Sequence, residues 1–133
     1  MGLVRATLLP MRDIEALSER IRAFATARDW EQFHTPKNLV LALAGEVGEL
    51  AAELQWRTDA QISEAATAGT PEIARVRDEM ADVLIYLVRL ADVLDVDLIE
   101  AANAKIDRNE QRYPEHLARG SNEKYDRLRD TQE

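Results

Sequence analysis

The fold of this chain is decided by the stretch TPKNLVLALAGEVGELAAEL, residues 35–54. Thr35 is a residue type that caps helix N-termini, and a proline such as Pro36 is favoured at the first helical position. The apolar residues that follow recur at the three- and four-residue spacing of an amphipathic helix. A second Thr-Pro pair at residues 70–71 opens the same pattern, which extends to about Leu94. The sequence therefore predicts two long helices that begin at these prolines.

Two further helices are expected on either side of this pair. Apolar positions recur at helical spacing over about 11–28, and residues 97–100 have the spacing of a capping box for a helix that ends near Arg112. Residues 57–70 are polar, rich in alanine and interrupted by glycine, which predicts a loop with at most one short turn. No alternating strand pattern of useful length is present in the sequence. The predicted fold class is all-α, a four-helix bundle.

Size and composition indicate one globular domain. The 133 residues are 46% apolar and 32% charged, and the net charge of −8 argues against an exposed surface for a nucleic acid polymer. No cysteine is present, so disulfides and thiolate zinc sites are excluded. No apolar run approaches the roughly 20 residues of a membrane span, and the N-terminus lacks the apolar segment of a signal peptide. We expect a cytoplasmic protein with no membrane contact and a single domain over 1–133, with its core at about 11–115, a loose arm at 1–10 and a polar tail at 120–133.

Acidic residues fall on the faces of the two long helices that should pack inward. Successive residues of a helix advance by about 100°. By this measure the positions that share one face of the first long helix are Leu39, Leu43, Glu46, Glu49, Leu50 and Glu53. Those that share a face of the second are Val76, Glu79, Asp82, Val83, Tyr86 and Leu90. Each inward face holds an acidic pair, and buried carboxylates repel each other and lose hydration unless a cation compensates them.

The alternative is that these acids lie on a solvated face. Apolar runs argue against it, because LVLALA comes shortly before Glu46 and VLIYLV directly follows Asp82. Gly45 and Gly48 each disfavour a helix by about 1 kcal/mol relative to alanine. We expect these glycines to let a neighbouring helix or a ligand approach the backbone closely. Together the features favour a metal site.

The identity of the metal is predicted from the donor atoms. Carboxylate oxygens are the ligands that hard ions such as Mg²⁺ and Mn²⁺ select, whereas di-iron bundles use Glu-x-x-His motifs. The two histidines, His34 and His116, do not lie three residues after any of these four acids of the long helices. We therefore expect Mg²⁺, with Mn²⁺ as the alternative.

The acidic pattern also resembles that of a known family. Glu46-x-x-Glu49, followed about 30 residues later by Glu79-x-x-Asp82, is similar to the metal motif of the MazG-like all-α nucleotide pyrophosphohydrolases. The segments that resemble the dCTP-hydrolysing branch of that family are RDWEQFH at 28–34, NLVLALAGEVGEL at 38–50, QW at 55–56, DVLIYLV at 82–88, KIDRN at 105–109, RYP at 112–114 and ARGS at 118–121. The likeness covers nearly the whole domain.

That resemblance implies a helical bundle that assembles into homodimers or homotetramers, with active sites near the subunit contacts. It implies hydrolysis of dCTP, or of a related or modified deoxynucleoside triphosphate, to the monophosphate and pyrophosphate, as upkeep of the nucleotide pool. The acids that it assigns to Mg²⁺ and catalysis are Glu46, Glu49, Glu79 and Asp82. The residues that it assigns to the cytosine and sugar are Trp30, Phe33, His34, Trp56 and Tyr86. It assigns phosphate and sugar contacts to Lys105 and Asn109, with Tyr113 as a further candidate.

The residues alone leave other roles open. A tryptophan more often packs in a core or an interface, His34 by itself would suit a loop, and Tyr86 is equally a core residue. Arg108 and Arg112, on the same face of the last helix, are equally part of an ordinary solvated face.

The predicted chemistry needs charge neutralisation, an in-line nucleophile and positioning. We hypothesise that water activated at the metal site attacks the α-phosphorus and that pyrophosphate leaves, with Glu49 as one candidate to orient the water. The sequence has no P-loop motif. Three rival hypotheses are a non-catalytic bundle that senses nucleotide or metal, a structural dimerisation domain, and the same chemistry on dUTP or a damaged nucleotide.

Overall fold

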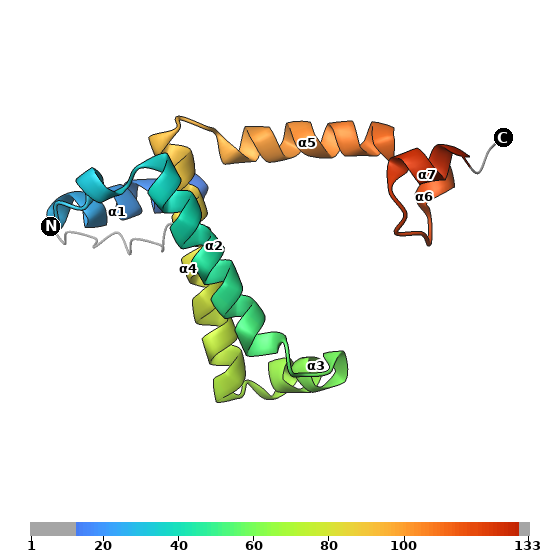
Figure 1. Ribbon diagram of the computed structural model, residues 1–133, viewed down its shortest axis with the longest axis horizontal. Coiled ribbons are helices and arrows are strands. Elements are labelled where there is room, and N and C mark those ends of the chain that lie inside the picture. Colours follow the sequence, from blue (N-terminus) through green and yellow to red (C-terminus); the bar gives the residue numbers. More distant parts are fainter. Residues whose placement is uncertain (1–12, 131–133) are drawn as a thin grey trace, which may run out of the picture. The chain divides into compact units, whose positions relative to one another are not determined.

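The computed structural model describes residues 13–130, which form helices and no strand. The helices are α1 (Ile14–Ala27), the 3₁₀ helix η1 (Glu31–Phe33), α2 (Pro36–Leu54), α3 (Asp59–Ala68), α4 (Pro71–Val93), α5 (Leu98–Arg112), α6 (Glu115–Ala118) and α7 (Tyr125–Asp130) (Figure 1). Contacts within the chain divide the helices into two units, and the boundary between the units lies between Val96 and Asp97 in the sequence. The all-α prediction is confirmed.

The two Thr-Pro pairs open helices where the sequence predicts them. Thr35 has an extended backbone, and its side-chain oxygen accepts a hydrogen bond from the Asn38 amide at 3.3 Å. Pro36 then occupies the first turn of α2, and Pro71 does the same in α4. Both predicted long helices are confirmed, and their ends agree with the expected ones to within about one residue.

The pairing of α2 with α4 organises the first unit. Figure 1 shows the two helices side by side, with α3 in the connection between them. All the positions predicted to face inward on α4, from Val76 to Leu90, are partly buried. On α2 the same holds except for Glu49, which is exposed. The acids Glu46, Glu79 and Asp82 therefore lie along the seam between the helices.

The most deeply buried part of this unit lies where α1 packs against α4. Leu39 and Val88 are each 1% exposed, and they fill the seam at this end together with the small side chains of α1 and α4. An ion pair joins the two helices, because the Arg22 guanidinium on α1 donates from Nε to the Asp92 carboxylate on α4 at 3.0 Å.

The prediction of a loop over residues 57–70 is wrong. Asp59–Ala68 form α3, which starts with a full capping box between Thr58 and Gln61 and ends at Gly69 in the left-handed conformation, at φ +64°. Alanine is the best helix former, so an alanine-rich segment between a cap and a glycine folds as a helix despite its weak apolar pattern.

The first and last predicted helices are also present. The predicted helix over 11–28 is observed as Ile14–Ala27, and Met11 and the arm at 1–10 lie outside the described residues. α5 begins after Asp97, whose carboxylate accepts from the Glu100 amide at 3.0 Å.

Within the expected polar tail, residues 125–130 form α7, in which Leu128 is buried. None of the described helices has the length and apolar character needed to cross a membrane.

Candidate metal and nucleotide site

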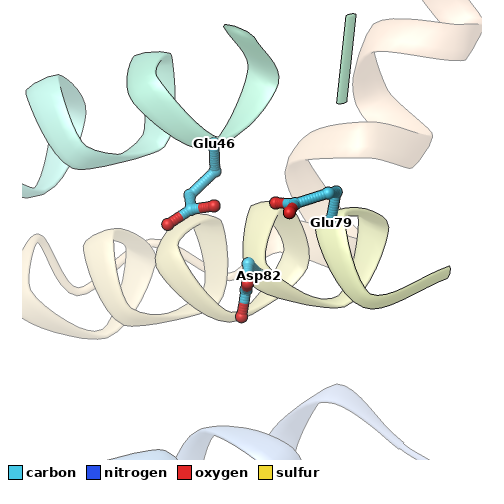
Figure 2. A group of neighbouring side chains, drawn as sticks. All are labelled: Glu46, Glu79 and Asp82. Atoms are coloured by element: carbon cyan, nitrogen blue, oxygen red, sulfur yellow. The ribbon is translucent and has the colours of Figure 1, made fainter. Parts of the chain in front are cut away.

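Three carboxylates converge between α2 and α4. Figure 2 shows Glu46 extending from α2 toward Glu79 and Asp82 on α4. Each side chain offers one oxygen, and these three oxygens lie within 4.8 Å of one another. The spacing of three residues between Glu79 and Asp82 places both on the same face of α4. Three of the four acids predicted for the metal site are thus brought together.

The acid cluster lacks compensating groups. Glu46 Oε2 and Glu79 Oε2 are both buried and have no hydrogen-bond partner. Among the described residues, no lysine or arginine forms an ion pair with Glu46, Glu79 or Asp82. A buried anion without a partner is costly, so such a cluster retains protons or binds a cation.

The pKa values of two of these acids rise accordingly. Loss of hydration, then the neighbouring carboxyl group of Glu46 and repulsion by Glu49, raises the pKa of Glu79 to about 7. The pKa of Glu46 is raised as well, first by loss of hydration and then by the charge of Glu49. Both shifts indicate a shortage of positive charge at the cluster.

The cluster fits a hard divalent cation. It consists only of carboxylate oxygens, they are close enough together to share one ion, and two of the buried oxygens have no other partner. Soft or thiolate-binding metals are excluded by the donor set, because sulfur and imidazole are absent from it. Glu46, Glu79 and Asp82 are therefore the residues that can hold the metal.

Glu49 stands apart from these three. Its side chain is exposed and supplies none of the three converging oxygens. Its charge nevertheless acts on Glu46 and Glu79, so it lies beside the cluster. By the 100° rule Glu49 is about 80° from Leu39 around α2, at the margin of the buried face. Its assignment as a metal ligand stays a prediction.

A pocket adjoins the acids. It has a volume of about 350 Å³, within the range of small-molecule sites. Its lining residues are Trp30, Phe33, His34, Asn38, Leu39, Ala42 and Tyr86. The structure thus brings together four of the five residues predicted for the base and sugar.

Sequence reasoning missed Asn38, Leu39 and Ala42 in this lining. The signal was available, because Ala42 and Asn38 lie one and two turns before Glu46 on α2, on the same side as the acid.

Hydrogen bonds and a ring contact hold the segment between α1 and α2 beside this pocket. The Trp30 amide donates to the Ala25 carbonyl at 3.0 Å, and the Trp30 ring meets the Phe24 ring edge-on with centroids 5.6 Å apart. The side-chain amide of Asn38 donates to the Phe33 carbonyl at 3.0 Å. These contacts explain why aromatic residues outside the long helices reach the seam.

The pocket and the acids lie one helical turn apart on both helices. Ala42 precedes Glu46 by four residues on α2, and Tyr86 follows Asp82 by four residues on α4. Four residues correspond to about 6 Å along a helix. An aromatic pocket and an oxygen-rich cation site therefore stand next to each other along one seam.

Three predicted contact residues lie elsewhere. Trp56, just after α2, is 85% exposed and does not line the pocket. Lys105 and Asn109 belong to α5 in the second unit. Their roles toward a substrate stay predictions.

The glycines of α2 have free space around them. A Cβ atom at Gly45 or Gly48 would meet nothing within 4 Å. The expected close approach of a neighbouring helix is therefore absent among the described residues, and the approach of a ligand stays a prediction.

Several known proteins are similar to this chain in sequence. The model of the MazG-like family matches residues 42–128. The dCTP pyrophosphatase 1 of Rattus norvegicus is 51% identical over 116 residues, which cover 87% of this chain and 68% of that protein. The dCTP pyrophosphatase 1 of Homo sapiens is 48% identical over 124 residues, covering 93% and 72%.

The fold is similar to a solved structure as well. A crystal structure of a pyrophosphatase from Archaeoglobus fulgidus DSM 4304 matches with a TM-score of 0.70 at 37% identity, over 80% of this chain and 96% of that one.

Proposed function

Since this chain belongs to the MazG-like family, we propose that it is a nucleoside triphosphate pyrophosphohydrolase that converts dCTP to dCMP and pyrophosphate, clearing this nucleotide from the precursor pool. The observation that supports this most directly is the position of the aromatic pocket one turn from the three acids. A nucleotide has the same layout, with an aromatic base at one end and phosphates at the other.

The base occupies the aromatic pocket in this proposal. Trp30, Phe33 and Tyr86 provide flat apolar surface, and His34 and Asn38 provide polar groups at the edge. Stacking of a base on an aromatic side chain contributes roughly 1–3 kcal/mol. A volume of about 350 Å³ suits a pyrimidine with part of its sugar.

The triphosphate faces the acids. Mg²⁺ held by Glu46, Glu79 and Asp82 would neutralise phosphate charge and lower the pKa of a nearby water. The water oxygen bonds to the α-phosphorus, the bond from that phosphorus to the bridging oxygen breaks, and pyrophosphate leaves with the electron pair. The proton that the water loses passes to a carboxylate of the site and then to solvent. We assign to Glu49 the orientation of the attacking water, because its exposed carboxylate borders the cluster without being one of its three converging groups.

We further propose that the enzyme is a homodimer or homotetramer. The large apolar side chains exposed on α2 and α4 are Val40, Leu41, Val47, Met80, Leu84, Ile85, Leu87 and Val93. Apolar surface of this extent on a helix pair is typical of subunit contacts. Trp56 would then contact substrate in the site of a neighbouring copy, and Lys105 and Asn109 would bind phosphate and sugar. A precursor-pool substrate also implies a cytoplasmic location.

The test is product analysis with the purified protein, Mg²⁺ and each standard deoxynucleoside triphosphate. Equal amounts of dCMP and pyrophosphate from dCTP, lost with EDTA and in Glu46→Gln, are expected. Asp78→Asn serves as the matched control, because Asp78 is an exposed acid on α4 outside the cluster. Turnover of a different nucleotide would keep the reaction and replace the substrate. Absence of turnover with all of them would contradict the proposal.

A further inference from the structure

A buried arginine lies behind the pocket. Arg89 on α4 is 6% exposed, and its Nε donates a hydrogen bond to His34 Nδ1 at 3.0 Å. Its Nη1 donates to the Asp92 carboxylate at 2.9 Å, one turn further along the same helix. The side chain is therefore held at both of these nitrogens, and one of them is directed at the histidine that lines the pocket.

This contact determines which nitrogen of His34 carries the proton. A guanidinium only donates hydrogen bonds, so Nδ1 must offer its lone pair to Arg89. A neutral imidazole has one donor and one acceptor nitrogen, so the proton of His34 lies on Nε2. Burial and then the positive charge of Arg89 lower the pKa of His34, which keeps the ring neutral near pH 7.

We propose that Arg89 is a positioning residue for base selection, which fixes His34 in the Nε2–H form so that the ring presents a hydrogen-bond donor to the base. This inference rests on the proposed function. Cytosine has an acceptor at N3, whereas uracil carries a hydrogen there and is a donor. In this proposal Nε2 meets the base at N3, where a donor matches dCTP and opposes dUTP. With the proton free to move to Nδ1, the same ring would accept from uracil.

Asp92 supports this arrangement by neutralising the buried guanidinium. Its carboxylate also pairs with Arg22 from α1, so it has one buried and one exposed arginine partner. Arg22 has no contact with His34. The two arginines thus allow a matched comparison. Substitution of either one removes a partner of Asp92, but only substitution of Arg89 removes the hydrogen bond to His34.

The first experiment is nitrogen NMR of the imidazole rings in wild-type protein, Arg89→Gln and Arg22→Gln, without nucleotide. His116, in the second unit, serves as an internal reference. We expect wild type and Arg22→Gln to show a pyridine-like Nδ1 and a pyrrole-like Nε2 at His34. Arg89→Gln should show both tautomers in exchange. A protonated Nδ1 in the wild type, or no change in Arg89→Gln, would overturn the proposal.

The second experiment measures kcat and KM for dCTP and dUTP. Loss of one fixed hydrogen bond should raise the KM for dCTP about tenfold in Arg89→Gln, leave kcat much less affected, and lower the preference for dCTP over dUTP by a similar factor. Arg22→Gln should keep that preference within about twofold. Equal losses in both variants would show a structural effect on the helix pair and contradict the inference.

Two provisions keep the test decisive. Should Arg89→Gln not fold, His34→Gln replaces it, because a glutamine amide can rotate to donate or accept and should lose the preference while Arg89 stays in place. Should the wild type turn over no nucleotide, the proposed function fails. The inference is then judged on the NMR result and on the relative binding of dCTP and dUTP, and equal binding would refute it.

Discussion

Glu79 on α4 lies opposite Glu46 on α2 in the acid cluster, and the pKa of Glu79 is raised to about 7. Burial is the main cause, and the neighbouring carboxyl groups of Glu46 and Glu49 raise the pKa of Glu79 further. With a pKa of about 7, Glu79 keeps its proton to a higher pH than an ordinary glutamate does. A cation that enters the cluster must displace this proton.

The metal-free protein should lose stability as the pH rises. An ordinary glutamate has a pKa of 4.5, and folding raises that of Glu79 to about 7. Between these values the folded chain binds more protons than the unfolded chain, so the free energy of unfolding falls with pH across this window. Thermal unfolding in EDTA at pH 5 and pH 7.5 measures the effect. Glu79→Gln should flatten the slope, and Asp78→Asn should retain it. Identical slopes in wild type and Glu79→Gln would refute this account.

Mg²⁺ should reverse that trend. Because binding displaces protons, its affinity should increase between about pH 6 and 8, and the stabilisation that it provides should grow with it. At 100 times the dissociation constant a bound ion stabilises the fold by about 2.7 kcal/mol. Calorimetry in buffers with different ionisation enthalpies would detect proton release. A binding enthalpy independent of the buffer would contradict the role of Glu79.

Trp30 should carry much of the affinity for the base. Trp30→Ala is expected to raise KM for dCTP by about tenfold or more, since a stacked base contributes roughly 1–3 kcal/mol. Trp30→Phe keeps an aromatic face and the edge contact with Phe24, so its loss should be smaller. Steady-state kinetics on both variants tests this. Equal KM values in wild type and Trp30→Ala would remove Trp30 from the base site.

Leu39 should be the most sensitive leucine of α2. It is 1% exposed where α1 meets the helix pair, so Leu39→Ala should cost about 2–5 kcal/mol. Leu94, the residue directly after α4, is 51% exposed, and Leu94→Ala removes the same atoms at a cost of about 1 kcal/mol or less. Urea titration compares the two. Similar losses would show that the packed end is not where the structure places it.

Substitution by alanine should raise the stability of the protein at Gly48 and lower it at Gly69. Gly48 lies inside α2 with free space around it, so Gly48→Ala should stabilise the protein by about 0.5–1 kcal/mol. Gly69 ends α3 at φ +64°, and Gly69→Ala should destabilise it by about 1 kcal/mol or more. Urea unfolding decides both. A loss of activity in a stabilised Gly48→Ala would indicate that the ligand uses this space.

The long helices and the acids were accessible from the sequence because their signals are local. A Thr-Pro pair and two acids three residues apart are read within one or two turns. They correctly predicted α2 and α4, and of the four acids predicted for the site, Glu46, Glu79 and Asp82 converge between these helices. The helix α3 differs from the expected loop because its apolar spacing is weak. Its signal in the sequence is instead the capping pattern Thr58-x-x-Gln61.

The remaining features depend on distant parts of the chain. The hydrogen bond from Arg89 to His34 joins residues 55 positions apart, and no spacing rule relates them. Glu49 shares the acidic motif but lies at the margin of the buried face, a difference that appears only when the packing partner of α2 is known. A motif therefore identifies which residue types meet, and tertiary packing decides which members of the motif converge.

The one-turn separation of pocket and acids allows this scaffold to change its substrate without changing its reaction. Ala42 has the smallest side chain in the pocket lining, and it lies one turn from Glu46 on α2. A larger residue there would narrow the room for a ring while the catalytic acids keep their positions. Substitutions at such lining positions can thus change which nucleobase fits the pocket. Evolution toward a different nucleotide substrate then requires no change at Glu46, Glu79 or Asp82.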